Sequence, residues 1–462
     1  MNHSFKLKLL RDAIAEGSIP TLSDDALLST PSIKRGSMIS SVNDVRVNYA
    51  LRCAIPGDVP VQVICDHLGL TLYVVMSSGR VYSAGGSYGY FGLGDGTADY
   101  GVDIADARIV DYSGKITFVS IEWYIPIALT DSGQLIWWGH HANYGMNTVG
   151  YGTYRDGSYV WHPAVEPYSS AVPLDGVTNI IFQSIDIGEW CGCGLTIDGK
   201  LYSWGYGGLG TLGRGLGDTW DRLPTPGEVV HPEGDPRYWV YANTGHQGMC
   251  AIDDLGQLWT WGDNGEGQLG IGNDTRYWDT PQKVGIDTDW VKCIPSESRY
   301  IAIKTDGSIW GWGYNSDEYW LNHDPADVGY HVLNPPDNID STPPITWCEH
   351  WSPLKLSGSH EFTDFSSGYY HVIALKADGT AWGMGMDGYD GALGLGDDTD
   401  FVTDWTQITE GAWTLFSQIF CHYGNAIAIG TDNNIYFWGA FYALEEVNYY
   451  YPTRWQLPNQ TE

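Results

Sequence analysis

Basic residues are scarce in this chain. Its 462 residues include 23 lysines and arginines against 56 aspartates and glutamates, a formal net charge of −33. Binding a phosphate backbone needs lysine and arginine clustered on the contacting face, so nucleic acid is not expected as a partner. We interpret the charge as a solvated acidic surface that keeps a large, aromatic-rich particle soluble, with a basic partner surface as the alternative.

The sequence also has no long apolar run and no paired cysteines. No segment is long enough to span a membrane, and no apolar region follows Lys6 and Lys8 as in a Sec signal peptide. Of the eight cysteines, five are scattered without zinc-like pairing: Cys53, Cys65, Cys293, Cys348 and Cys421. Cys191 and Cys193 form C-x-C, a spacing that could serve a metal or redox site, but we interpret Cys193 as a buried structural thiol because the equivalent positions of the other repeats are apolar. We expect reduced thiols in a protein made in the cytoplasm.

Catalytic motifs are missing or out of context. There is no H-E-x-x-H, and the G-x-S-x-G match at 85–89 has no strand-to-helix setting. Two matches to G-x-G-x-x-G, at 205–210 and 383–388, are followed by no crossover helix. We therefore expect no enzyme activity, no cofactor and no metal, and we interpret the aspartate-bearing loops as surface turns. His371 occupies a variable position, which we expect to face a central channel or a rim.

What the sequence does contain is a repeat. Seven times, an apolar strand leads into a turn and then a second strand that ends in glycine, usually after an aromatic residue. The closing glycines are Gly85, Gly139, Gly205, Gly262, Gly313, Gly385 and Gly439. Their spacing of 51 to 72 residues is typical of propellers and solenoids.

Alignment on the closing glycine shows which positions are apolar. Ten residues before it, every unit has an aliphatic residue; six before it, six units have glycine and the seventh has Asn433, as a tight hairpin requires. The second strand carries aromatic residues on one face and aliphatic residues on the other. A strand that is apolar on both faces must be covered on both, which favours an all-β, seven-bladed β-propeller.

The amino-acid sequence of the units resembles a known repeat. Segments such as GLTIDGKLYSWG and AIDDLGQLWTWGDNGEGQLGIG are similar to repeats of the regulator of chromosome condensation family. Five units also contain a Gly-rich phrase after the closing glycine, as in LGIGNDT (269–275), whereas the fifth and seventh lack it. The resemblance covers about residues 61–462 and implies a seven-bladed propeller. It leaves function open, because the family includes exchange factors, a light receptor and an enzyme inhibitor.

Residues 1–60 lack the repeat and differ in charge. They hold seven basic and six acidic side chains, a net charge of +1, so the propeller carries −34. The stretch FKLKLLRDAIAEG predicts a short amphipathic helix, with Lys6, Lys8 and Arg11 among its polar residues. VRVNYALRC (45–53) predicts a strand that helps to close the first or last blade. We interpret 1–60 as an N-terminal anchoring arm and 61–462 as the propeller.

The sequence leaves several functions open. Trp161, Trp320 and Trp351 lie in or beside two long insertions, where aromatics suit protein or sugar recognition. We predict a non-enzymatic structural or interaction protein, in particular a bacteriophage virion component anchored by its arm, from a bacteriophage or bacterial family member. The alternatives are a cytoplasmic protein, a receptor- or glycan-binding module acting through Trp-rich loops and, less favoured, a guanine-nucleotide exchange factor. Expected partners are other subunits of a large assembly or a host surface receptor or glycan.

Overall fold

A computed structural model provides the fold of most of the repeat region. It describes residues 57–65, 71–85, 108–122, 125–139, 168–173, 179–189, 191–219, 222–232, 238–296, 298–316, 347–356, 361–368, 371–387, 391–396, 401–409, 415–422, 424–441 and 447–455. The predicted helix and strand of residues 1–56 lie outside these ranges.

The described residues form seven antiparallel sheets, each built from four strands that are consecutive among them. Blades 1 to 3 comprise β1 (Pro60–Cys65), β2 (Thr71–Met76), β3 (Val81–Gly85) and β4 (Arg108–Ile109); β5 (Ile116–Glu122), β6 (Ile125–Thr130), β7 (Leu135–Gly139) and β8 (Tyr168–Pro173); β9 (Phe182–Ile187), β10 (Cys191–Thr196), β11 (Leu201–Tyr206) and β12 (Arg222–Val229). Blades 4 and 5 comprise β13 (Trp239–Thr244), β14 (Gly248–Asp253), β15 (Leu258–Asp263) and β16 (Tyr277–Lys283); β17 (Trp290–Pro295), β18 (Arg299–Lys304), β19 (Ile309–Ser316) and β20 (Trp347–Lys355). Blades 6 and 7 comprise β21 (Phe362–Ser367), β22 (His371–Lys376), β23 (Ala381–Met386) and β24 (Phe401–Gln407); β25 (Phe416–His422), β26 (Asn425–Gly430), β27 (Ile435–Phe441) and β28 (Val447–Trp455).

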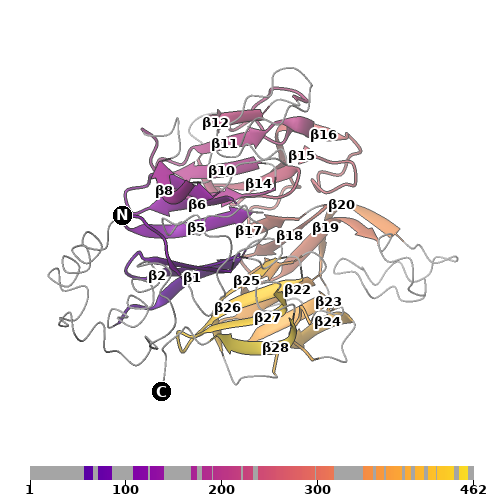
Figure 1. The fold of residues 1–462 in the computed structure, drawn as a ribbon. Helices are drawn as coiled ribbons and strands as arrows, with labels where there is room; N and C mark the ends of the chain where they lie inside the picture. Colours follow the sequence, from indigo (N-terminus) through magenta and orange to yellow (C-terminus); the bar gives the residue numbers. More distant parts are fainter. Residues whose placement is uncertain are drawn as a thin grey trace, which may run out of the picture.

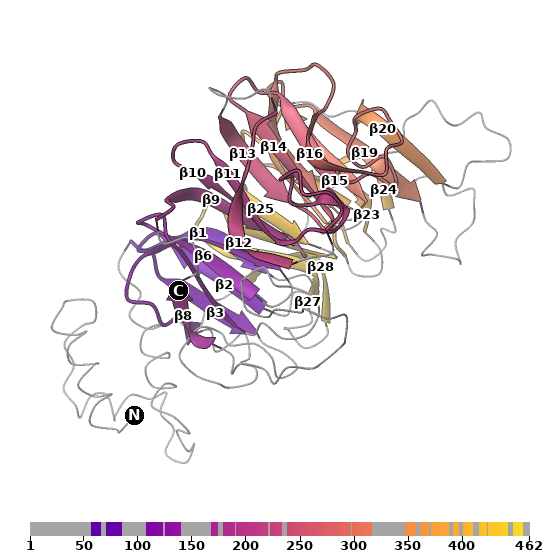
Figure 2. The same cartoon turned by 90° about the horizontal axis from the view of Figure 1, so that it is seen from above.

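The seven sheets close into a ring. Blade 7 lies beside blade 1 in both views (Figure 1 and Figure 2), and β1 contacts β25 and β26. The first strands of several neighbouring blades also touch, as β13 does with β9 and β17. The predicted all-β, seven-bladed propeller is confirmed. Within the described ranges the sole helical element is a 3-10 turn, Gly208–Gly210, and none of their helices could cross a membrane.

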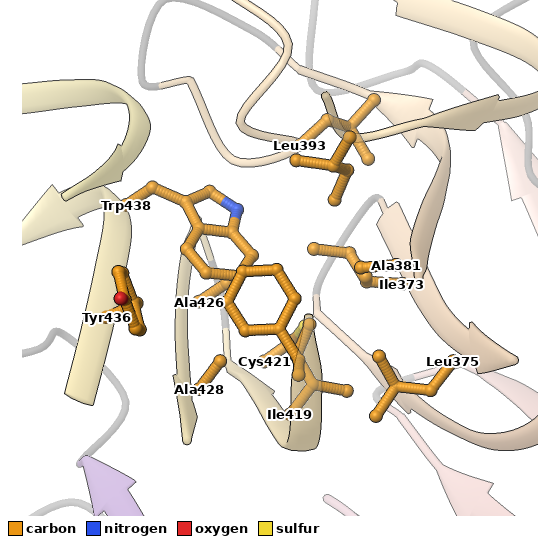
Figure 3. Close-up of a cluster of buried hydrophobic side chains, with 12 residues drawn as sticks. Ile373, Leu375, Ala381, Leu393, Ile419, Cys421, Ala426, Ala428, Tyr436 and Trp438 are labelled. Atoms are coloured by element: carbon orange, nitrogen blue, oxygen red, sulfur yellow. The ribbon is translucent and has the colours of Figure 1, made fainter. Parts of the chain in front are cut away.

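The repeated apolar positions form the contacts between blades. In β15, Leu258 packs among residues of blade 5, whereas Trp259 and Trp261 pack among residues of blade 3. All seven aliphatic side chains ten residues before the closing glycine are buried. Figure 3 shows the same arrangement between blades 6 and 7, where Ile373 and Leu393 face Trp438. The predicted coverage of both faces is therefore confirmed.

In three of the five blades that carry tryptophan before the closing glycine, the indole bonds the residue just before the Gly-rich phrase of the preceding blade. The indole N–H of Trp261 donates to Thr211 O (3.0 Å), that of Trp312 to Gln268 O (2.9 Å) and that of Trp438 to Ala392 O (3.1 Å). A phrase glycine lies close to each of these three indoles: a Cβ on Gly270 would stand 2.4 Å from the indole nitrogen of Trp312. The tryptophan of one blade and the Gly-rich phrase of the preceding blade thus hold the two blades together, and we call this contact the clamp.

Two departures from the repeat pattern coincide with the absence of this clamp. The phrase is missing from units five and seven, and the blades that follow them in the ring are 6 and 1. Those two blades carry Met384 and Ala84 where the other five carry tryptophan. Of the remaining tryptophans at this position, Trp138 donates to the Tyr73 hydroxyl (3.3 Å), and the buried indole nitrogen of Trp204 has no partner among the described residues. The bond to a backbone carbonyl of the preceding blade is thus present at three interfaces, and at the two interfaces that lack the phrase the donor is absent as well.

Polar side chains of the first strands bridge all seven blade interfaces. In one layer, a side chain donates to a backbone carbonyl of the next blade: Gln62 to Val119 (2.8 Å), Tyr241 to Cys293 (2.8 Å), Lys292 to Phe365 (2.7 Å) and Gln418 to Val61 (2.8 Å). In a second layer, a side chain accepts a backbone N–H of the next blade: Ser120 from Ile187 (3.1 Å), Asp186 from Thr244 (2.8 Å) and Ser366 from Cys421 (2.8 Å). The first layer thus bridges four blade interfaces, and the second layer bridges the other three.

Gln62 is a good test of these bridges because it both donates to and accepts from Val119. We expect Gln62→Ala to lower the free energy of unfolding by about 1–2 kcal/mol, because two backbone groups lose their partner. The exposed Gln183 lies on the equivalent strand of blade 3, so Gln183→Ala should stay within about 0.5 kcal/mol. Urea unfolding measures both, and equal effects would contradict the bridging role.

Candidate interaction surface

The residues predicted from sequence to bind a partner lie mostly where the structure gives no description. Lys6, Lys8, Arg11, Trp161 and Trp320 are outside the described ranges. Trp351 lies in strand β20, and its side chain is not described. Their role in binding therefore stays a prediction.

Most titratable groups inside the propeller have structural roles. Asp186 accepts from the Thr244 backbone N–H and hydroxyl, and burial raises the pKa of its carboxyl. Burial also raises the pKa of the Cys191 and Cys193 thiols, as the interpretation of Cys193 as a structural residue requires. Across the described part of the chain, no three His, Cys, Asp or Glu side chains are grouped to hold a metal ion.

The expected position of His371 was wrong. Its side chain is 1% exposed and its ring packs against Gly368, because β22 lies behind the first strand of its blade. Burial lowers the pKa of His371 from 6.5 to about 3, and the positive charge of Arg299 adds to the shift. The ring is therefore a neutral part of the core.

This burial predicts a pH dependence. As pH falls from 6.5 towards about 3, the unfolded chain binds a proton at His371 while the folded chain does not, so stability is lost across that window. His371→Leu should remove this part of the acid sensitivity. Urea midpoints at the two ends of the window test it, and an unchanged pH dependence in the variant would contradict a neutral buried ring.

Exposed apolar side chains gather on one face of the propeller. We call it the hairpin face: it carries the turns between second and third strands, and each first strand begins there, since Trp239 pairs with Asp253 next to the turn of blade 4. Of the eleven large apolar side chains exposed among described residues, only Leu216 lies on the opposite face. The other ten are Val61, Ile181, Ile197, Val230, Tyr238, Val240, Leu255, Ile286, Val291 and Leu415.

Six of these side chains form what we call the hairpin patch, over blades 3 to 5: Ile181, Ile197, Val230, Tyr238, Leu255 and Ile286. Backbone bonds hold its parts together. Ile197 N donates to Ile181 O (3.2 Å) and Asp254 N to Tyr238 O (2.9 Å). Tyr238 also lies over Gly199, where a Cβ would be 2.8 Å from its own. The exposed fractions are high, at 65% for Ile197, 69% for Val230 and 89% for Ile286.

Carboxylates surround the hairpin patch. Among the described residues, Asp198, Glu228, Asp254, Asp287, Asp289 and Asp306 lie in or beside its turns and links, against Lys200, Lys283 and Lys304, so these six negative and three positive charges give −3. Lys200 pairs with Glu228 (3.1 Å). Lys304 is 7% exposed, pairs with Asp287 and Asp289, and lies over the rings of Trp290 and Trp310. The outer surface therefore presents mainly carboxylates.

Sequence reasoning missed the hairpin patch, although a signal was present. The two turn positions before the hairpin glycine hold Ser, Thr, Asp or Ala in most units, as a surface turn favours. Blades 3 and 4 place Ile197 and Leu255 there instead. An isoleucine or leucine at a turn that other repeats keep polar marks an exposed apolar group.

Sequence comparisons place the repeats in a known class. The regulator of chromosome condensation (RCC1) repeat model matches residues 198–252 and 256–294, and a second RCC1 repeat model matches 362–391. The chain is 25% identical over 400 residues to the ultraviolet-B receptor UVR8 of Arabidopsis thaliana, covering 85% of this chain and 80% of the receptor. It is 31% identical over 203 residues to the human E3 ubiquitin-protein ligase HERC2, covering 43% of this chain and 4% of the ligase.

Solved structures agree on the fold. Human WBSCR16 superposes with a TM-score of 0.57 at 19% identity, over 76% of this chain and 85% of that one. Prp20p of Saccharomyces cerevisiae, described with its binding to Gsp1p and histones, gives 0.57 at 18% identity, over 79% and 82%. The chain is thus a seven-bladed β-propeller that contains regulator of chromosome condensation repeats.

Proposed function

We propose that this chain is a non-enzymatic interaction module that binds a protein partner on its hairpin face. The observation that carries the proposal is the gathering of exposed apolar side chains there, which costs solubility unless a partner covers them. Turns held by seven packed blades supply the rigid scaffold on which recognition surfaces are usually built.

The relatives support an interaction or regulator role. One is a receptor, and another is described as binding two proteins, Gsp1p and histones. No residue-level feature of the described surface favours nucleotide exchange in particular, and the insertions expected to bind glycans lie mostly outside the described ranges. Partner proteins are thus the better supported class.

The finer prediction of a bacteriophage virion component has gained no support. The curated relatives described above come from a plant and an animal. Anchoring by residues 1–60 and a place in a large assembly stay predictions. Deletion of that segment, followed by measurement of assembly into particles, tests them.

The proposed function is tested by comparing matched surface variants of the full chain. Ile197→Ser with Leu255→Ser changes the hairpin patch, and the control Leu216→Ser changes an exposed apolar residue on the opposite face. We expect a partner that co-purifies with the wild-type and control proteins to be lost with the patch variant. Loss with the control alone, or recovery of nothing but second copies of this chain, would contradict the proposal.

A further inference from the structure

Building on the proposed function, we infer that the hairpin patch takes a basic segment of the partner protein, with apolar side chains along one side and lysine or arginine beside them. The inference concerns the chemistry of the occupant. It rests on the arrangement of apolar and charged groups at the turns of blades 3 to 5.

The apolar part of the occupant follows from the patch itself. Ile197 and Leu255 project from successive turns, and Tyr238 lies between them on the segment bonded to both blades. Ile286 extends the row towards blade 5. Branched and aromatic side chains with no matching polar groups are best covered by similar side chains, as when an apolar side of a helix or strand lies in a groove.

The basic part follows from the charges. Six carboxylates surround the patch, and two of the three lysines are already paired with them. The Lys304 ammonium group lies over two indole rings, and its side chain is almost fully buried. A neutral or acidic occupant would leave the negative field unbalanced, whereas lysine or arginine at its edges would complement the field and favour correct orientation.

Because the whole chain is strongly acidic, a test must distinguish binding at the hairpin patch from general attraction of cationic peptides. The protein's net charge of −33 attracts any cationic peptide. Attraction without apolar contact is weakened by salt and does not depend on Ile197. An occupant specific to the patch must need both features. The experiment therefore separates charge from apolar contact on each side of the interface.

Three synthetic peptides of about 18 residues serve as probes. The first has leucine along one helical side and lysine elsewhere, the second replaces lysine by glutamate, and the third replaces leucine by serine. We expect the leucine–lysine peptide to bind the full chain at about 0.15 M salt. The other two should bind about tenfold more weakly or worse.

Protein variants complete the test. Ile197→Ser with Leu255→Ser should weaken the leucine–lysine peptide about tenfold, and Leu216→Ser should not. Asp198→Asn with Asp254→Asn should also weaken binding of the leucine–lysine peptide, and each asparagine keeps a side-chain oxygen that can accept hydrogen bonds in the turn. Equal binding of the serine–lysine peptide, or no effect of the patch variant, would overturn the inference. So would tighter binding of the leucine–lysine peptide, but not of the serine–lysine peptide, after Lys6→Ser, Lys8→Ser and Arg11→Ser, because the chain's own segment would then be the occupant.

These outcomes are distinguishable from failure of the proposed function. A partner that co-purifies through the hairpin patch but presents an acidic or neutral segment leaves the interaction module intact and refutes the basic occupant. Absence of any partner that depends on the patch refutes the module itself, whatever the peptides do.

Discussion

Trp312→Ala is expected to lower the free energy of unfolding by about 3–5 kcal/mol, among the largest effects of any single change in this chain. The side chain is fully buried, packs against Trp290 and Tyr300, and donates its indole N–H to Gln268 O of the preceding blade. The substitution therefore opens a cavity between blades 4 and 5 and leaves a carbonyl unpaired. Urea unfolding of the full chain measures the loss.

Substitution by phenylalanine separates the cost of the cavity from the cost of the lost hydrogen bond. Trp312→Phe keeps most of the apolar contact and removes the N–H, so it should cost about 1–3 kcal/mol. Trp382 donates to Thr380 Oγ1 within its own hairpin rather than to a neighbouring blade. Trp382→Phe should therefore cost clearly less. A larger cost at Trp382 than at Trp312 would refute the clamp between blades.

Gly313→Ala is expected to cost about 3 kcal/mol, from a positive φ and from a backbone clash. This closing glycine has φ +100°, and a Cβ would stand 2.4 Å from Ser298 O, in the residue before Arg299, which pairs with Gly313 in the strand ladder. Thermal or urea unfolding gives the cost.

Gly285 provides the matched control. It also has a positive φ, +58°, but nothing lies within 4 Å of an added Cβ. Gly285→Ala should therefore cost only about 1 kcal/mol. Equal costs at both positions would mean that the backbone conformation alone, without close approach, selects glycine at the end of the strand.

Periodicity made the core of the fold predictable. A position that is aliphatic in seven units out of seven must be buried in a similar setting each time, so Val75 and Ile429 could be assigned to the core without a structure. The hairpin column was equally clear, since Asn433, its one exception, adopts φ +62°. Seven copies within one chain allow equivalent positions to be compared, which a single copy of the unit would not.

Relations between neighbouring blades were harder to predict. The missing phrase of unit five and the presence of Met384 in unit six are visible in the sequence, but their link needs the ring, in which the indole of one blade reaches the carbonyl of another. A variable column does not mark an exposed position, since His371 belongs to one and is covered by β21. Likewise, Ile197 and Tyr238 are 41 residues apart and adjoin only across a blade boundary.

The central claim, that the hairpin face binds a protein partner, is tested most directly by site-specific photocrosslinking in the full chain. Replacement of Leu255 by a photoreactive benzoylphenylalanine places the probe in the hairpin patch, and the same replacement of Leu216 places it on the opposite face. We predict a covalent adduct with a partner protein from position 255 and none from position 216. An adduct from 216 with none from 255 would contradict the account.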